Sequence, residues 1–111
     1  MIRVRLDDIA GEGVSHDPEI RKRVMIRNGR VPHLTTFAQS RFRPGQATTA
    51  HSHRDMFEIF LVEAGTGVVR IDGRELPLEP GVCVVIEPGE VHDMANTGNE
   101  ELVLTYFGIA E

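Results

Sequence analysis

The sequence lacks the residues that build disulfides and membrane spans. Cys83 is the only cysteine among 111 residues, so no disulfide can form within the chain. No apolar run approaches the roughly 20 residues that a membrane-spanning helix needs. Residues 1–5 also lack the apolar stretch of a signal peptide. We therefore expect a cytoplasmic protein with no membrane partner. Cys83 lies in the apolar run 82–86, where a free cysteine is expected to be a small core residue.

The chain also lacks an excess of positive charge, because its basic residues are fewer than its acidic ones and are scattered. The chain has 12 lysines and arginines against 17 aspartates and glutamates, a net charge of -5. Nucleic acids and anionic membranes require a concentrated positive surface, and the only basic cluster is residues 21–23, so no nucleic-acid partner is expected. Four other arginines could anchor an anionic substrate as planar bidentate donors, although surface exposure is the simpler expectation for each of them: Arg41, Arg43, Arg54 and Arg70.

The length allows one domain, preceded by an arm. The hydrophobic fraction of 41% suffices for one core. A domain of this size buries only about two-thirds of its unfolded surface, so a partner subunit would relieve the shortage. Residues 1–33 are charged and irregular, and we predict that they form an N-terminal arm. Within it, a short helix over 17–22 is possible, with Asp17 as N-cap and Pro18 at the first helical position.

Residues 34–111 have the texture of a single all-β domain. Short β-type runs alternate with glycine, proline and asparagine corners, and Asp72-Gly73 between two of them is a strong hairpin signal. We predict antiparallel strands over residues 34–43, 47–53, 57–63, 67–71, 74–78, 83–86, 91–96 and 102–109.

The run Phe57–Val62 is unusual because both of its alternating faces are apolar, with Glu58 as the sole exception. A strand with one wet face should alternate apolar and polar residues. The face opposite Glu58 therefore needs cover from a second sheet, from the arm or from another subunit. Together with the small core, this predicts a homodimer.

Three histidines and one glutamate stand in an order that indicates a metal site. His51 and His53 share one face of a strand, because side chains there repeat every two residues. Glu58 follows at an odd offset, so a turn at Arg54-Asp55 is needed to return it to the same interior. His92 follows a Pro-Gly corner much later in the chain. Three imidazoles and a carboxylate suit iron, manganese, nickel or cobalt with open positions, or tetrahedral zinc.

A less specific interpretation of these residues also exists. A histidine on a strand is more often a surface or satisfied core residue than a ligand, and the pair His51 and His53 alone leaves the two interpretations equally open. Glu58 favours the metal, because a carboxylate in an apolar strand is costly to bury without a cation.

Two sequence motifs contain the four candidate ligands: Gly45-x5-His51-x-His53-x4-Glu58-x6-Gly65 and Gly81-x5-Glu87-x-Gly89-x2-His92-x3-Asn96. They resemble the two motifs of the cupin superfamily. The second motif departs from the family pattern at Glu87, where a proline is usual and where this chain places Pro88 one residue later. The resemblance covers about residues 34–109 and includes all four candidate ligands.

The resemblance implies a double-stranded β-helix, or jelly-roll barrel, holding one divalent metal on His51, His53, Glu58 and His92. It implies a small-molecule metalloenzyme of dioxygenase, decarboxylase or isomerase type. The alternative is a non-catalytic cupin that binds a small molecule or regulates.

Several other residues are placed by strand alternation alone. Phe60, Val62 and Met94 share faces with the candidate ligands, so they either line a pocket or belong to plain core. Tyr106 and Phe107 must point to opposite faces of the last strand, and the sequence does not say which one faces inward. We expect His16 and His33 on the surface and Asn96 in a turn.

Overall fold

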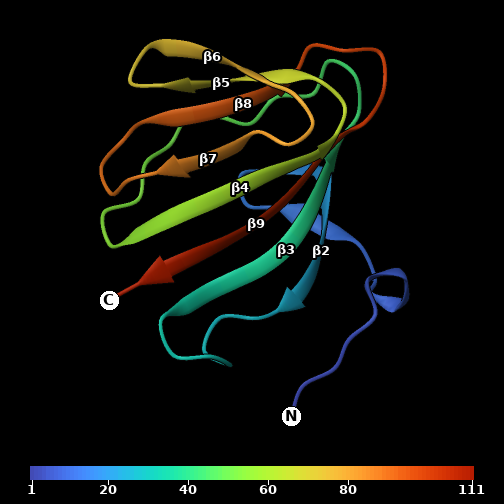
Figure 1. The fold of residues 1–111 in the computed structure, drawn as a ribbon, viewed down its shortest axis with the longest axis vertical. Coiled ribbons are helices and arrows are strands. Elements are labelled where there is room, and N and C mark those ends of the chain that lie inside the picture. The colour runs from blue at the N-terminus through green and yellow to red at the C-terminus, as the bar shows by residue number, and fades with distance from the viewer.

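The computed structural model describes all 111 residues as two antiparallel β-sheets (Figure 1). The larger sheet has the order β1-β2-β3-β9-β4-β7, and the smaller has the order β6-β5-β8. No helix is long and apolar enough to cross a membrane. The elements are η1 (Leu6–Asp8), β1 (Glu12–Val14), β2 (Asp17–Ile26), β3 (Leu34–Phe42), β4 (Met56–Ala64), β5 (Gly67–Ile71), β6 (Arg74–Leu78), β7 (Cys83–Ile86), β8 (His92–Asn96) and β9 (Leu102–Ala110).

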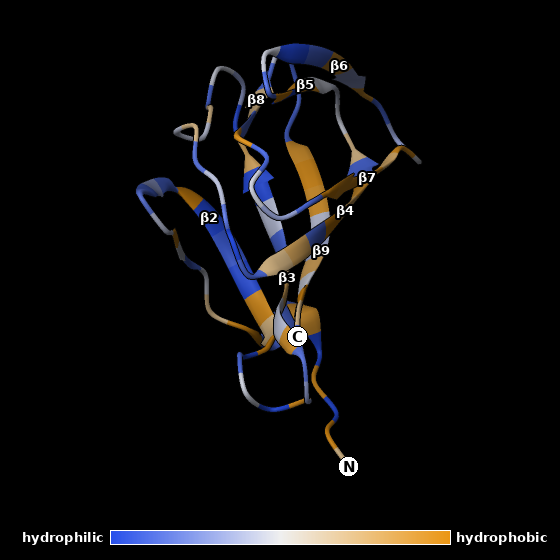
Figure 2. Ribbon diagram, turned by 90° about the vertical axis from the view of Figure 1, so that its left-hand side faces the viewer, coloured by the Kyte–Doolittle hydropathy of each residue, from blue (hydrophilic) through white to orange (hydrophobic).

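The core lies between the two sheets. In Figure 2 the smaller sheet lies above, the strands of the larger sheet run below it, and β4 has mostly hydrophobic colouring. Along β4, Glu58, Phe60 and Val62 face the interior, while Phe57 and Leu61 face outward and are 38% and 40% exposed. The predicted all-β double-sheet barrel is confirmed. Its core cluster is Ile20, Phe42, Phe60, Val62, Val69, Leu78, Ile86, Met94, Leu102 and Leu104.

The predicted hairpin at Asp72-Gly73 is confirmed. It joins β5 to β6, with Ile71 paired to Arg74. Both central residues have positive φ, 49° at Asp72 and 83° at Gly73. Two positive φ values characterise the tight turn whose twist matches the flanking strands, which is why Asp-Gly is favoured there.

The predicted strand over residues 47–53 is wrong. This segment runs beside β8 but makes only two isolated bridges, Ala47 with Ala95 and His51 with His92. Between the two bridges the segment advances four residues, from Ala47 to His51, whereas β8 advances three, from Ala95 to His92. The segment therefore contains one extra residue. An extra residue interrupts a ladder, and the segment therefore pairs at separate points instead of forming a strand.

The helix predicted over 17–22 is also wrong, because this segment belongs to β2. Ile20 and Val24 are buried at 0% and 7% exposure, and β2 pairs with β3. The Asp17 side chain does not cap a helix; it accepts hydrogen bonds from the backbone N–H and hydroxyl of Thr49, both at 2.9 Å. The boundary expected between an arm and a barrel at residue 33 therefore does not follow the sheets, since residues 12–26 extend the larger one.

Cys83 is exposed, so its prediction as a core residue is wrong. It pairs with Leu61 across β7 and β4, on the outward face of the larger sheet. In the run 83–86 only Ile86 is fully buried, because the strand is covered on one side alone.

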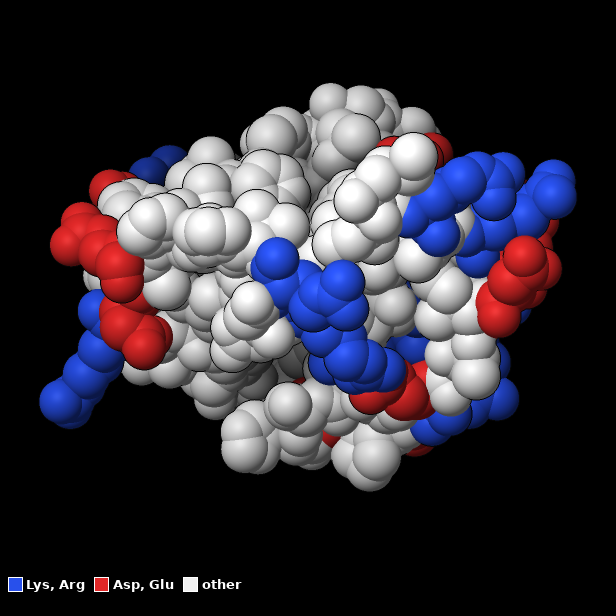
Figure 3. All heavy atoms as spheres, turned by 90° about the horizontal axis from the view of Figure 1, so that it is seen from below, with Lys and Arg blue, Asp and Glu red and all other residues white.

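The outward face of the larger sheet carries a continuous apolar area on β3, β9, β4 and β7. The strand register aligns Phe37, Phe107, Ile59 and Val85 in one row across these four strands. Next to it lies a second row of Leu34, Ile109 and Phe57. Seen from below, Figure 3 shows an area without charged residues beside a group of lysine and arginine side chains that crosses the middle of the view.

Candidate metal centre

The structure brings the four predicted ligands together. One nitrogen or oxygen atom from each of His51, His53, Glu58 and His92 lies within 4.8 Å of the other three. Glu58 comes from β4 of the larger sheet, and His92 is the first residue of β8 in the smaller sheet. His51 and His53 lie on the segment between these sheets, and the chain bends at Arg54 and Asp55 before β4 begins. This bend is the turn that the odd offset to Glu58 requires.

Backbone hydrogen bonds fix the segments that carry the histidines. The His51 N–H donates to the carbonyl of His92 at 3.1 Å, and the His92 N–H donates back at 2.9 Å. The Gly89 N–H donates to the carbonyl of His53 at 2.6 Å. Gly89 has φ 87°, which an L-residue with a side chain rarely adopts. The two motifs therefore meet through the backbone as well as through the ligands.

Two of the imidazoles are oriented by backbone carbonyls. Nδ1 of His51 lies 2.9 Å from the carbonyl oxygen of Thr49, and Nδ1 of His92 lies 3.0 Å from that of Glu90. A carbonyl oxygen can only accept, so in the neutral imidazole the proton is on Nδ1. The Nε2 lone pair is then free to face the centre, as a metal ligand requires.

The facing atoms at the centre have no hydrogen-bond partners. Nε2 of His53 and Nε2 of His92 lie 3.0 and 3.3 Å from Oε1 of Glu58. All three atoms are buried, and their geometry does not make hydrogen bonds. Buried lone pairs that face one another are costly unless a cation lies among them. The residues therefore fit a divalent metal ion bound by three nitrogens and one oxygen, a donor set suited to iron, manganese, nickel, cobalt or zinc.

The ionisable groups of this cluster influence one another. Burial alone would raise the pKa of the Glu58 carboxyl, but its contact with His92 and the charges of the nearby histidines outweigh this and lower the pKa. Burial lowers the pKa of His53. Burial would also lower the pKa of His92, but contacts with Glu58 and the Glu90 carbonyl raise it instead. Glu58 is therefore anionic at neutral pH, whereas His92 holds its proton more tightly than an ordinary histidine.

A cavity of about 530 Å³ opens beside the cluster. Phe60 and Met94, two of the three residues considered for its lining, do line it, whereas Val62 is 2% exposed and lies in the core. Polar side chains of Ser40 and Thr48 contribute to the same wall.

Tyr106 is a cavity residue that the sequence alone did not place. Its ring stacks on Phe60 with centroids 5.0 Å apart and planes at 23°. Burial raises the pKa of the Tyr106 hydroxyl to about 12, so it remains a neutral hydroxyl at physiological pH. Tyr106 pairs with Phe60 across β9 and β4. Strand alternation alone places Tyr106 and Phe107 on opposite faces, and the pairing of Tyr106 with the inward-facing Phe60 decides that Tyr106 is the inward one.

The other candidate residues lie elsewhere. His16 is exposed as expected but also reaches the cavity lining, and His33 is exposed with Nδ1 3.1 Å from the Ala110 carbonyl. Asn96 serves the turn after β8, since its side chain bonds Phe42, Gly98 and Glu100. None of the four arginines considered as substrate anchors lines the cavity: Arg41 pairs with Glu101, Arg70 pairs with Glu75 and Asp93, and Arg43 and Arg54 are exposed.

A family model described as a cupin domain matches residues 38–108, a range that contains all four candidate ligands. The chain belongs to the cupin family. An oxalate-binding protein of Thermotoga maritima is 35% identical to this cupin over 66 residues, which are 60% of this chain and 54% of that protein. The matched part is thus about half of that curated relative.

Solved structures extend the comparison over the whole chain. A Thermotoga maritima structure described as a predicted oxalate decarboxylase has a TM-score of 0.91 and 26% identity to this cupin, covering 99% of this chain and 100% of that one. The cupin domain of Schizosaccharomyces pombe Cnp3 has a TM-score of 0.84 at 11% identity, covering 99% and 74%. The polyketide cyclase RemF of Streptomyces resistomycificus also scores 0.84, at 22% identity, covering 100% and 80%. The last two likenesses show the fold alone, and one fold hosts many different functions.

Proposed function

We propose that this cupin is a metal-dependent enzyme that acts on a small carboxylic acid. The observation that carries the proposal is the convergence of three imidazoles and one carboxylate, without hydrogen-bond partners at their facing atoms, beside a cavity of small-molecule size. The substrate class is supported by the names of its relatives, an oxalate-binding protein and a predicted oxalate decarboxylase. The reaction would be a decarboxylation, a dioxygenation or an isomerisation.

The four ligands would hold the ion in this mechanism. When bound, the metal would supply Lewis-acid or redox chemistry, with iron, manganese, nickel, cobalt and zinc as the candidates. The chain itself fixes the imidazoles through the carbonyls of Thr49 and Glu90. Because Glu58 is anionic at neutral pH, it offsets part of the ion's charge.

The cavity wall provides the remaining functions. Phe60 and Met94 present apolar surface beside the ligands, which keeps water away from the reacting groups. The neutral Tyr106 hydroxyl is able to donate a hydrogen bond to a carboxylate oxygen. Ser40 and Thr48 add further hydroxyl groups to the wall. A small dicarboxylic acid would thus meet donors on one side and the metal on the other.

The test compares oxalate and malonate with protein loaded in turn with each of the five metals. Release of CO2, oxygen uptake and formation of product are followed. Glu58→Gln keeps the shape of the side chain but removes its charge, so metal affinity and turnover should fall together while the circular dichroism spectrum stays unchanged. Glu63→Gln is the matched control, since Glu63 lies on the same strand and is exposed.

A non-catalytic binding protein is the second candidate, favoured by the name of the oxalate-binding relative. It predicts that oxalate binds tightly and is recovered unchanged with every metal. That result would replace the enzyme by the binding function. Failure of the wild-type protein to take up any of the metals would contradict the enzyme, whereas tight binding of oxalate to the metal-free protein would support the binding function.

We also propose that the protein is a homodimer of the cytoplasm. Dimerisation would cover the apolar rows on the outward face of the larger sheet, where Phe57, Leu61, Val85 and Ile109 are all more than a third exposed. The single cysteine is a free thiol, in keeping with a reducing compartment.

A further inference from the structure

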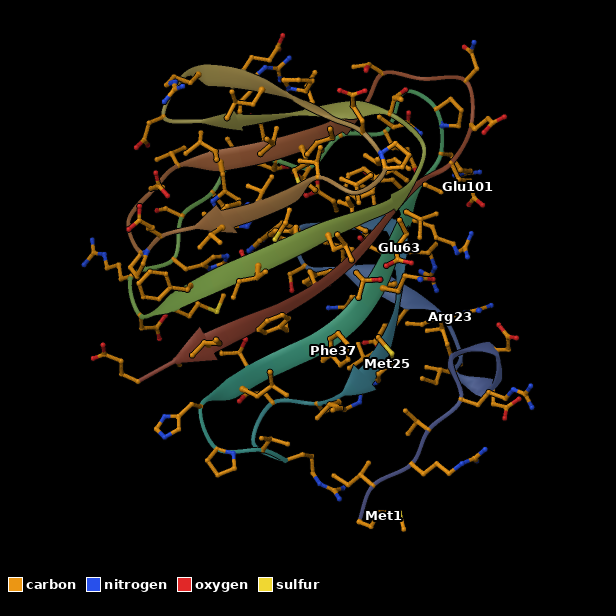
Figure 4. All side chains as sticks on the ribbon, viewed as in Figure 1. Met1, Arg23, Met25, Phe37, Glu63 and Glu101 are labelled. Atoms are coloured by element: carbon orange, nitrogen blue, oxygen red, sulfur yellow. The ribbon has the colours of Figure 1, made fainter.

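We infer that the outward face of the larger sheet carries a second binding site, which takes the phosphate group of a small molecule. The site is a polar pocket of about 260 Å³ at the β2–β3 end of the sheet, and no hydrophobic residue lines it. Figure 4 shows two of its residues, Arg23 and Glu101, at the right-hand end of this sheet. The inference does not rest on the proposed function, because Arg21, Arg23 and Arg41 lie on the sheet face opposite to the metal ligands.

Charge is strongly concentrated in this pocket. Five of its ten lining residues are basic, namely Arg21, Lys22, Arg23, Arg41 and Arg43, and only two are acidic. Lys22 alternates to the inward face of β2 and also lines the cavity beside the metal cluster. The four arginines and two glutamates leave a charge of +2, four positive less two negative, whereas the whole chain has a charge of -5. A polar concavity of one sign attracts anions more strongly than scattered surface charge does.

The sheet register forces two of these cations together. Arg21 on β2 lies directly opposite Arg41 on β3. Like charges at directly opposite positions destabilise a pair of strands. Arg41 is compensated by Glu101, whose Oε1 lies 3.2 Å from its guanidinium. Arg21 has no such partner, and a bound anion would relieve the repulsion.

Arg21 is held in place without being neutralised. Its guanidinium donates to the carbonyl oxygen of Gly11 at 3.0 Å and to that of Pro18 at 3.3 Å. These acceptors are uncharged, so they position the group and leave its charge available. Arg43 makes no ion pair, although its backbone N–H is fixed by the Gln46 side chain at 2.7 Å. An anion would therefore meet two guanidinium groups that have no carboxylate partner, and that of Arg21 is already held in place.

Gln39 gives the pocket an uncharged amide group whose oxygen makes no hydrogen bond. It lies opposite Arg23 in the register, and its Oε1 is buried without a hydrogen-bond partner. This oxygen would accept a hydrogen bond from the hydroxyl of a singly protonated phosphate. With the amide reversed, its NH2 would donate to a phosphate oxygen instead.

The dimensions favour a small molecule over a nucleic acid. The five cations line one pocket of about 260 Å³, whereas a nucleic acid needs positive charge spread along its backbone. Guanidinium groups on two neighbouring strands suit the several oxygens of a phosphate, which they bind in a bidentate manner. The ligand class is therefore a phosphorylated metabolite or phosphate itself.

The experiment is a titration of the full-length ¹⁵N-labelled protein with inorganic phosphate and with glycerol phosphate at low ionic strength, followed by amide NMR. We expect saturable shifts in residues 19–23 and 39–46 with both probes, while residues 51–58 and 92 stay unchanged. Glycerol phosphate binding tighter than phosphate would identify a metabolite as the ligand, and equal affinity would identify the phosphate group alone.

Two variants and one control complete the test. Arg21→Gln and Arg43→Gln should each weaken binding about tenfold, the effect of one charge-assisted hydrogen bond. Arg74→Gln, an exposed arginine on β6 of the other sheet, should leave affinity unchanged. Equal effects of all three substitutions, shifts confined to residues 51–58 and 92, or tighter binding of malonate than of phosphate would each overturn the inference.

Discussion

His92 determines how protons compete with a metal at the centre. Its pKa is raised in the metal-free protein, because contacts with Glu58 and Glu90 outweigh the effect of burial. Protonation therefore stabilises the metal-free fold below the ordinary histidine pKa of about 6.5, and this stabilisation is lost as pH rises through the higher folded pKa. Metal binding requires the unprotonated nitrogen and acts in the opposite direction.

We accordingly expect metal affinity to fall as pH decreases from about 8 to 6, within the range where histidines titrate. Glu58 contributes nothing to this window, because its lowered pKa keeps it ionised. Calorimetric titration with cobalt at several pH values, in buffers of different ionisation enthalpy, measures affinity and proton release together. Equal affinity across the range, with no proton released, would exclude His92 as a ligand.

At this scale the sequence predicted the four residues that the structure brings together as candidate ligands, because their spacing and chemical type are local properties. It did not predict the cavity position of Tyr106 or the free amide of Gln39. Both depend on which residue lies opposite across a strand pair, and that register forms only in the folded sheet.

Among the elements, the junction between β4 and β5 depends on Gly65. This residue has φ 83°, and an added Cβ would overlap the backbone carbonyl of Glu101 and the Cα of Leu102. These atoms of Glu101 and Leu102 belong to the backbone, so they cannot move away as the end of a flexible side chain could. The motif glycine therefore permits two segments of chain to pass in direct contact.

Gly65→Ala should lower the free energy of unfolding by about 3 kcal/mol or more, since it combines an unfavourable φ with a backbone overlap. Gly73→Ala is the control, because Gly73 has the same φ of 83° but open space around it. Gly73→Ala should lower the free energy of unfolding by only about 1 kcal/mol, which is the effect of the unfavourable φ alone. Urea denaturation measures both, and equal losses would show that the overlap is relieved by a local shift.

The elements also show where local signals failed. Strands after residue 34 follow the alternation and the glycine corners, whereas β2 was read as a helix because Asp17-Pro18-Glu19 matches a helix start. Burial of Ile20 and Val24 against the core outweighs that signal. The break at residues 47–51 comes from a one-residue mismatch with β8, which no local pattern reveals.

For the whole molecule, the apolar outward face leads to a prediction about assembly. Leu61→Asp places a charge in the proposed interface, where burying it unpaired is costly, and should shift the protein from dimer to monomer. Leu76→Asp is the matched control, because Leu76 is 38% exposed, close to the 40% of Leu61, but lies on the smaller sheet. Sedimentation velocity at micromolar concentration gives the outcome. A wild-type monomer, or an unchanged dimer in Leu61→Asp, would contradict this interface.

The candidate ligands come from both sheets, with Glu58 on β4 and His92 on β8. An ion held between them would act as a cross-link that ties the two layers of the barrel at the open side of the core. Part of its binding free energy would then be folding free energy, about 2.7 kcal/mol when free metal is one hundred times the dissociation constant. Chelation should lower the melting temperature and speed amide exchange in β8, while exchange in the β2–β3 pair remains slow. The metal would thus stabilise the fold as well as take part in the reaction.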